Sequence, residues 1–209
     1  MTENVSRTEL FTGTKEVAEQ HRFDVAALEA YLRVHVAGFA GPLTVEQFKG
    51  GQSNPTFKLI TPSKTYVMRA KPGPAAKLLP SAHAIEREFR VMGGLAGTSV
   101  PVAAMHALCE DESVIGRAFY VMDFVDGRVF WEPQLPGMTP AQRAEIFDEM
   151  NRVMAALHQV DFVAAGLSDY GKHEGYLARQ IARWTKQYRA SETESIPAMD
   201  ALIEWLPAH

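Results

Sequence analysis

The feature that most constrains the fold is a polar loop that opens with two adjacent glycines and lies between two short runs typical of β-strands, residues 44–49 and 56–61. The loop consists of Gly50, Gly51, Gln52, Ser53 and Asn54. Adjacent glycines allow a tight turn, and the polar side chains that follow place hydrogen-bond donors beside bare backbone amides. The loop can therefore cover an anion, although an ordinary β-hairpin turn has the same pattern.

The residues after this loop predict a small sheet with one inserted helix. A third strand is expected at 65–70, after a Pro-Ser turn, and two more near 100–108 and 118–125. Between them, residues 81–95 have the apolar spacing of a helix. Five antiparallel strands with a helix after the third predict an α+β lobe.

The flanking regions are predicted to be helical. Residues 1–22 are expected to form a loose arm or a short helix, and Asp24 can cap a helix that ends near Gly38. Beyond residue 127, Thr139 and Gln142 form a capping-box pattern before an apolar stripe. Two further helices are expected, one carrying apolar residues from 177 to 188 and one after residue 197. The expected organisation is an arm with a packing helix at 1–42, a strand-rich lobe at 43–127 and the start of a helical lobe at 128–209.

Composition excludes several classes of partner. The net charge is −4 and the pI is about 6.0, so no basic surface for nucleic acid is predicted. The sequence has no window of about 18 uncharged apolar residues, so no membrane span is predicted. The single cysteine, Cys109, fits a reducing compartment. We expect a cytoplasmic protein with neither nucleic-acid nor membrane partners.

A cation and a carboxylate follow the glycine loop at positions that suit a nucleoside triphosphate. Arg69 ends the third strand and can make bidentate contacts with phosphates, while Glu88 on the next helix could pair with it. Lys71 competes for the role of the cation, because alternation along a strand puts residues 69 and 71 on one face. Glu88 is favoured over Glu86 by its place beside the apolar face of the helix. Arg69 could equally be a strand-edge arginine on a solvated face, and surface i,i+3 and i,i+4 pairs are the usual explanation for a glutamate such as Glu88.

The chain resembles the aminoglycoside-phosphotransferase-like (choline-kinase-like) small-molecule kinases, and most of all the kinase-like domains associated with acyl-CoA dehydrogenases. The resemblance runs from about residue 43 onward and rests on residues 50–57, 66–72, 84–89, 119–127 and 157–158. It implies a protein-kinase-like two-lobe fold that binds ATP. It also implies that Arg69 replaces the kinase lysine, that Glu88 is its helical partner, and that Asp123, Phe124 and Val125 form a hinge that binds adenine.

One departure from the family is as informative as the matches. Family members carry a His-Gly-Asp motif, a following asparagine and a metal-binding aspartate, and none of these occurs before His209. Those residues orient the acceptor and hold Mg²⁺, so no catalytic residue or metal ligand is predicted within the 209 residues. We expect a fragment of an ATP- and Mg²⁺-dependent kinase, with metal ligands beyond residue 209.

The acceptor is expected to be a hydroxyl of a small molecule, with a hydroxyacyl compound favoured over an aminoglycoside by the resemblance. An incomplete helical lobe would expose apolar surface and promote association. The alternative is an inactive module that binds a nucleotide or a protein partner.

Overall fold

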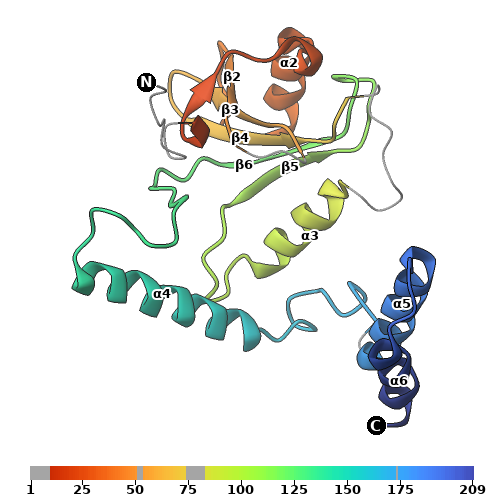
Figure 1. Cartoon of the computed structure of the whole chain (residues 1–209). Coiled ribbons are helices and arrows are strands. Elements are labelled where there is room, and N and C mark those ends of the chain that lie inside the picture. Colours follow the sequence, from red (N-terminus) through yellow and green to blue (C-terminus); the bar gives the residue numbers. More distant parts are fainter. Residues whose placement is uncertain (1–9, 51–53, 74–82, 173) are drawn as a thin grey trace, which may run out of the picture. The chain divides into compact units, whose positions relative to one another are not determined.

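The computed structural model describes residues 10–50, 54–73, 83–172 and 174–209. The chain forms two compact units, Met1–Ala165 and Gly166–His209. Among the described residues, the first unit contains the β-sheet and three complete α-helices, and the second contains two α-helices (Figure 1). No helix within these described stretches has the length and apolar character needed to cross a membrane.

The first unit is built on a six-stranded antiparallel sheet with the strand order β1-β2-β3-β4-β6-β5. The strands are β1 (Thr14–Lys15), β2 (Thr44–Phe48), β3 (Thr56–Ile60), β4 (Thr65–Ala70), β5 (Met105–Cys109) and β6 (Phe119–Asp123). Short connections link β2, β3 and β4, so these strands form a meander. After β4 the chain passes through a helix, returns to the sheet as the edge strand β5, and then forms β6 between β4 and β5. The predicted α+β architecture is confirmed.

The sixth strand, β1, was not anticipated. Within the stretch expected to be an arm, Thr14 pairs with Phe48 and Lys15 with Gln47, which extends the sheet beyond β2. The Thr14 hydroxyl also donates to a Glu46 carboxylate oxygen at 2.7 Å. Two residues are too few to show the alternation by which a strand is recognised in sequence, and the exposed edge of β2 supplies the missing hydrogen-bond partners.

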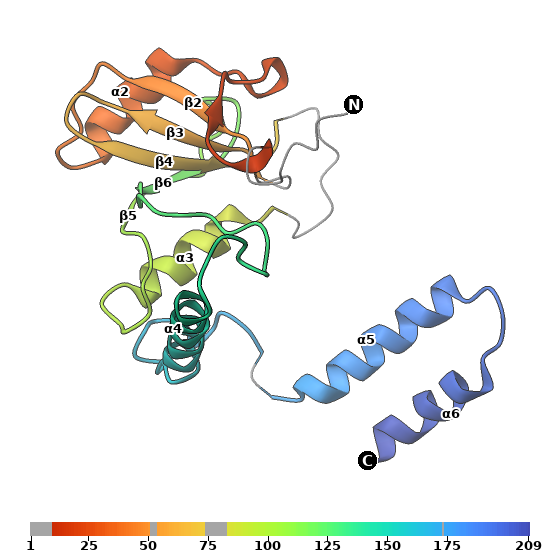
Figure 2. The ribbon, with the colours of Figure 1, turned by 60° about the vertical axis from the view of Figure 1, so that its left-hand side comes forward.

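The two faces of the sheet have different roles because side chains alternate along each strand. On one face, Phe57, Leu59 and Met68 are fully buried against helix α2 (Val25–His35), which is capped by Asp24 as predicted. Figure 2 shows α2 lying along this face. The alternate residues of β3 and β4, among them Thr56 and Arg69, point to the opposite face. That opposite face carries the candidate site.

Helix α3 (Ile85–Leu95) packs near β5 and β6 through a second apolar cluster. Ile85, Ala118 and Tyr120 form the buried centre of this cluster. The helix begins at Ile85, later than the predicted start at residue 81, and the described residues 83 and 84 are not helical. Residues 81 and 82 lie outside the described residues. The packing of Ile85 and Tyr120 fixes which side of α3 faces the sheet.

Helix α4 (Pro140–His158) begins as the sequence predicts. The Thr139 hydroxyl accepts from the Gln142 backbone amide, and the Gln142 side chain accepts from the Thr139 amide at 3.0 Å. The apolar stripe of this helix is not buried by the described residues. Its large side chains are between 47% and 59% exposed, namely Phe147, Met150, Met154 and Leu157.

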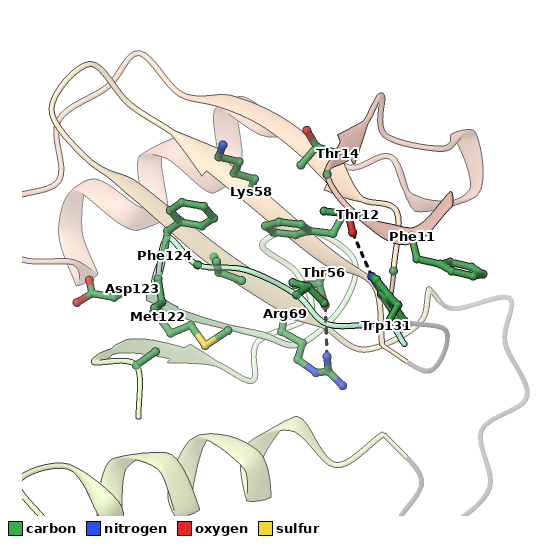
Figure 3. A pocket seen from close by; sticks show the side chains of 18 residues that line it. Phe11, Thr12, Thr14, Thr56, Lys58, Arg69, Met122, Asp123, Phe124 and Trp131 are labelled. Carbon is green, nitrogen blue, oxygen red and sulfur yellow. Dashed lines mark hydrogen bonds between the residues drawn. The ribbon is translucent and has the colours of Figure 1, made fainter. Parts of the chain in front are cut away.

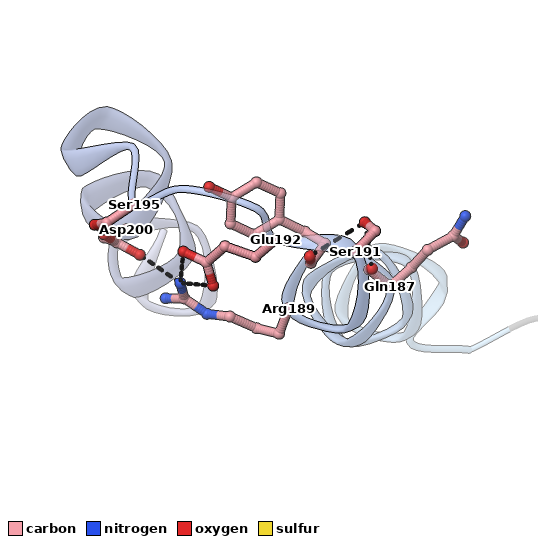
Figure 4. Close-up of polar contacts among 7 residues, drawn as sticks. Gln187, Arg189, Ser191, Glu192, Ser195 and Asp200 are labelled. Carbon is pink, nitrogen blue, oxygen red and sulfur yellow. Dashed lines mark hydrogen bonds and ion pairs between the residues drawn. The ribbon is translucent and has the colours of Figure 1, made fainter.

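The second unit is a helical hairpin of α5 (Tyr176–Ser191) and α6 (Pro197–Trp205). Its turn is held by Arg189, whose guanidinium bonds both Glu192 carboxylate oxygens and lies 2.6 Å from an Asp200 oxygen (Figure 4). The pKa of Arg189 is raised, chiefly by Asp200 and then by Glu192. Both helices were predicted from their apolar spacing.

Candidate nucleotide site

A cavity of about 540 Å³ lies on the face of the sheet opposite α2. Residues of β1, β2, β3, β4 and β6 line it, together with the connector that follows β6 and the segment that precedes β1 (Figure 3). Five of the predicted site residues lie in its wall: Gly50, Arg69, Asp123, Phe124 and Val125. The strand pairing brings these residues together from positions far apart in the sequence.

Arg69 is the predicted cation that lines this cavity, and Glu88 on α3 holds it. The distance between Arg69 Nε and Glu88 Oε2 is 2.8 Å, and Arg69 Nη1 lies 3.4 Å from the Thr56 hydroxyl. Thr56 is the β3 residue paired with Arg69 in the sheet register, so the strand pairing itself places this contact. A guanidinium held at Nε keeps outer N–H groups available for an anion.

Lys71, the competing cation, has a different partner. Its Nζ lies 3.1 Å from Glu86 Oε2, and Lys71 does not line the cavity. Glu86 and Glu88 are two positions apart on α3, which separates them by about 200° around the helix. Each carboxylate therefore meets a different cation, and the structure assigns Glu88 to Arg69.

Tyr120 adds a second contact to the Glu88 carboxylate. Its hydroxyl donates to Glu88 Oε2 at 2.9 Å, and its ring is buried beside Ile85. Burial, and secondarily the Glu88 carboxylate, raise the pKa of the Tyr120 hydroxyl. Tyr120 therefore remains a protonated donor that orients Glu88 toward Arg69. Tyr120 was not predicted from the sequence, although a tyrosine beside buried apolar positions in a central strand signals a buried hydrogen bond.

The glycine loop is described only at its ends. Gly50 lines the cavity, while Gly51, Gln52 and Ser53 lie outside the described residues. Asn54 is 2% exposed. Its Nδ2 donates to Glu88 Oε1 at 3.4 Å and its Oδ1 lies 2.7 Å from the His83 Nδ1. Asn54 thus ties the end of the loop to the start of α3 and supports Glu88, and it does not itself line the cavity.

The predicted hinge forms the other end of the cavity. The Asp123 amide already donates to the Ala104 carbonyl at 2.8 Å, and the Asp123 carboxylate lies 2.7 Å from both Lys64 Nζ and His106 Nε2. Lys64, and then His106, lower the pKa of Asp123. Among the described residues, no backbone hydrogen bond occupies Phe124 or Val125. These two residues therefore present the backbone groups that a base could use.

Phe11, Phe48, Lys58 and Trp131 are among the wall residues that were not predicted from the sequence. The rings of Phe48 and Phe124 are stacked with centroids 6.5 Å apart, and Lys58 Nζ lies 4.8 Å from the Phe124 centroid. Alternation along β2 and β3 could have indicated Phe48 and Lys58. No local sequence pattern predicts that Phe11 and Trp131 line the cavity, because both lie in segments without regular alternation.

No group of three or more His, Cys, Asp or Glu residues suited to a metal ion occurs within the described ranges. The cavity instead offers three kinds of contact: the Arg69 guanidinium for an anion, the rings of Phe48 and Phe124, and the backbone groups of Phe124 and Val125. This donor set fits a nucleotide, whose phosphates, base and sugar require those three kinds of contact.

Residues 44–209 match the family described as the phosphotransferase enzyme family. The chain belongs to this family. The match includes every strand of the cavity except β1, so the predicted family resemblance and the protein-kinase-like fold are both confirmed.

Relatives of this phosphotransferase family member are much longer proteins. This chain is 46% identical over 197 residues to acyl-CoA dehydrogenase family member 10 of Mus musculus. The aligned region covers 94% of this chain and 18% of that protein. This chain is 47% identical over 197 residues to acyl-CoA dehydrogenase family member 11 of Rattus norvegicus, covering 92% and 25%. The chain thus spans a quarter or less of these relatives.

A solved structure also resembles this phosphotransferase family member. A crystal structure from Ralstonia eutropha, provisionally described as an aminoglycoside phosphotransferase, is 69% identical with a TM-score of 0.78. The similarity covers 90% of this chain and 54% of the solved chain.

Proposed function

We propose that this chain is the nucleotide-binding part of an ATP-dependent phosphotransferase that transfers the γ-phosphoryl group to a hydroxyl of a small molecule. The observation that carries the proposal is that Arg69, paired with Glu88, lines a cavity whose wall also includes the predicted hinge residues Phe124 and Val125. Membership of the phosphotransferase enzyme family supports the same reaction class.

Each part of the site has a proposed role. Arg69 neutralises charge on the α and β phosphates, and Glu88 fixes the direction of its guanidinium. The amides of the loop from Gly50 to Ser53 cover the phosphates, and Asn54 anchors the loop to α3. The hinge residues Phe124 and Val125 bind the base through backbone groups, while Asp123 fixes the start of the hinge through Lys64 and His106.

The proposal places the catalytic loop and the Mg²⁺ ligands outside these 209 residues. The sequence contains no His-Gly-Asp motif, and the chain covers 54% of the solved relative. In phosphoryl transfer, Mg²⁺ neutralises charge on the β and γ phosphates, and an aspartate orients the attacking hydroxyl. What the chain's own residues supply is the binding and orientation of the nucleotide. The division into an arm at 1–42, a nucleotide lobe at 43–127 and a helical lobe from 128 is part of this proposal.

The proposed acceptor is a hydroxyacyl compound. The support is that curated relatives with 43–47% identity are named as acyl-CoA dehydrogenase family members, so an acyl substrate is favoured over an aminoglycoside. We propose the cytoplasm as the site of the reaction, supported by the single cysteine, which is buried and free. The acceptor class is tested with a protein that contains this chain and the proposed catalytic loop. Hydroxyacyl compounds and aminoglycosides are each offered as acceptors, and the rate of phosphate transfer from ATP to each is measured.

Calorimetric titration with ATP tests the nucleotide site. Arg69→Ala should weaken ATP binding at least about tenfold, because charge-assisted contacts with phosphate are lost. Lys71→Ala is the matched control, since it removes a cation of the same segment and a similar ion pair outside the cavity. Equal ATP affinity of Arg69→Ala and the wild type would reject the role of Arg69.

The 209-residue chain should show no phosphotransfer above background, since the groups that activate the acceptor are proposed to lie elsewhere. Transfer of labelled phosphate from ATP to any hydroxylated acceptor by this chain alone would contradict that part of the proposal. The same assay on the protein that contains this chain and the residues that follow it should show transfer.

A second candidate function is a module that binds a nucleotide or a protein partner without catalysis. The observation that favours it is the exposed apolar face of α4, formed by Phe147, Met150, Met154 and Leu157. Sedimentation velocity should show association of the chain, reduced when Met150 and Met154 are replaced by glutamine. ATP binding without phosphotransfer in the longer protein would favour this candidate over the enzyme.

A further inference from the structure

The segment just before the first strand lies along the nucleotide cavity, although it precedes the residues that match the family. The Gly13 carbonyl accepts from the Lys49 amide at 3.1 Å, directly beside Gly50. Pairing of β1 with β2 holds Thr14 opposite Phe48. These contacts keep Phe11 and the two residues after it in the wall of the cavity.

Phe11 meets a tryptophan from the connector that follows β6. The ring centroids of Phe11 and Trp131 are 5.1 Å apart at an interplanar angle of 42°. The indole Nε1 of Trp131 donates to the Thr12 hydroxyl at 3.1 Å, which joins residues 119 positions apart (Figure 3). We call this pair, Phe11 and Trp131, the aromatic clasp.

The clasp explains why residue 50 is a glycine. A Cβ at Gly50 would lie 3.0 Å from Trp131 Cζ2 and 3.1 Å from the Phe11 carbonyl oxygen. Gly50 does not have a positive φ, so it is not needed there for a left-handed conformation. Its role in the described structure is to let the indole ring and the Phe11 backbone approach β2 closely.

The position of the clasp along β2 indicates which part of a nucleotide it would meet. Phe48 stacks on Phe124 at the hinge, where the base is proposed to bind. Gly50 lies two residues further along, about 6.6 Å for extended chain, at the start of the loop proposed to cover the phosphates. The ribose is the part of a nucleotide that lies between its base and its phosphates.

We propose that Phe11 and Trp131 form a wall of the nucleotide site and pack on the ribose of the bound nucleotide. This inference rests on the proposed function. It makes Phe11, which lies outside the matched family region, part of the binding site, and it makes Trp131 a specificity-determining residue for nucleosides over free bases.

Calorimetry with adenine, adenosine and ATP tests the clasp. Phe11→Ala and Trp131→Ala should each weaken adenosine and ATP binding by about three- to tenfold, the contribution of an aromatic contact. Adenine binding should change less than about twofold, because the clasp is proposed to contact the ribose, whereas the base is proposed to bind at the hinge. Trp131→Phe should retain most of the affinity, and Phe147→Ala, an exposed aromatic of α4 outside the cavity, should bind like the wild type.

A fluorescence measurement provides a second readout. The chain has three tryptophans, so a Trp184→Phe and Trp205→Phe background leaves Trp131 as the only one. Acrylamide should quench Trp131 less when ATP is bound. Without nucleotide, Phe11→Ala should increase the quenching, and Phe11→Leu is a milder variant if the alanine protein does not fold.

The outcomes separate the two proposals. If the wild type binds ATP while both clasp variants bind adenosine and ATP with unchanged affinity, the clasp inference is overturned and the nucleotide site stands. If the clasp variants lose adenine binding as strongly as adenosine binding, the ribose contact is overturned. If the wild type binds no ATP, the proposed function fails and the clasp inference fails with it.

Discussion

Replacing Tyr120 with phenylalanine isolates the hydrogen bond that orients Glu88. The change deletes one hydroxyl and leaves the ring packed beside Ile85. A hydrogen bond to a charged group contributes about 1.5–3 kcal/mol. The Glu88 side chain is 36% exposed and keeps its contact with Arg69, so water can replace part of the lost bond. We therefore expect the substitution to lower the free energy of unfolding at pH 7 by about 1.5 kcal/mol, the lower end of this range.

Urea denaturation, followed through Trp131 in the Trp184→Phe and Trp205→Phe background, measures this loss within the first unit. With a slope of about 2 kcal/mol/M, the midpoint should fall by about 0.75 M at unchanged slope. Tyr66→Phe is the matched control: Tyr66 is buried in the adjacent strand, and its hydroxyl makes no hydrogen bond to another described residue. Equal midpoints for Tyr120→Phe and the wild type, or equal losses in both variants, would refute the reasoning.

The same tyrosine predicts an alkaline effect of definite sign. The folded pKa of Tyr120 is raised above the unfolded value of about 10, so its contribution to stability is complete below pH 10 and is lost as the pH rises above it. The wild type should therefore lose stability above about pH 10 more steeply than Tyr120→Phe does. Parallel declines of the two proteins between pH 9 and pH 11 would contradict the burial of this hydroxyl.

Two further predictions concern the hinge and helix α4. Because the folded pKa of Asp123 is depressed by Lys64 and His106, its contribution is present above the unfolded value of about 3.9 and is lost as the pH falls through the folded pKa. Asp123→Asn should therefore destabilise the protein at pH 7, and urea midpoints should converge with the wild type as the pH falls from about 5 toward 3; a constant gap would count against the ion pairs. Thr139→Ala should cost about 1 kcal/mol through loss of the N-cap, with Thr139→Ser as the conservative control, measured by helical circular dichroism during thermal unfolding. Identical melting of all three proteins would show that the cap does not limit the stability of α4.

Local patterns were sufficient for most of the secondary structure. The capping box at Thr139 and the Asp24 cap are interactions between residues three positions apart, so the sequence specifies them almost completely. The strands from β2 to β4 follow from alternation and from the turns between them. The two-residue strand β1 could not be predicted from such local patterns, because its partner strand lies about thirty residues away along the chain.

The sequence by itself determined that a glycine loop, a cation and a carboxylate occur in an order typical of nucleotide-binding lobes, and that Phe124 and Val125 follow a buried strand. Only the tertiary structure decided between Arg69 and Lys71, because that choice depends on the direction in which Glu88 points from α3. It also brought Trp131 to Gly50, and with it a reason for the glycine that the loop pattern could not supply. Alternation and capping act between near neighbours, whereas the angle of a helix and the path of a connector are set by packing across the whole unit.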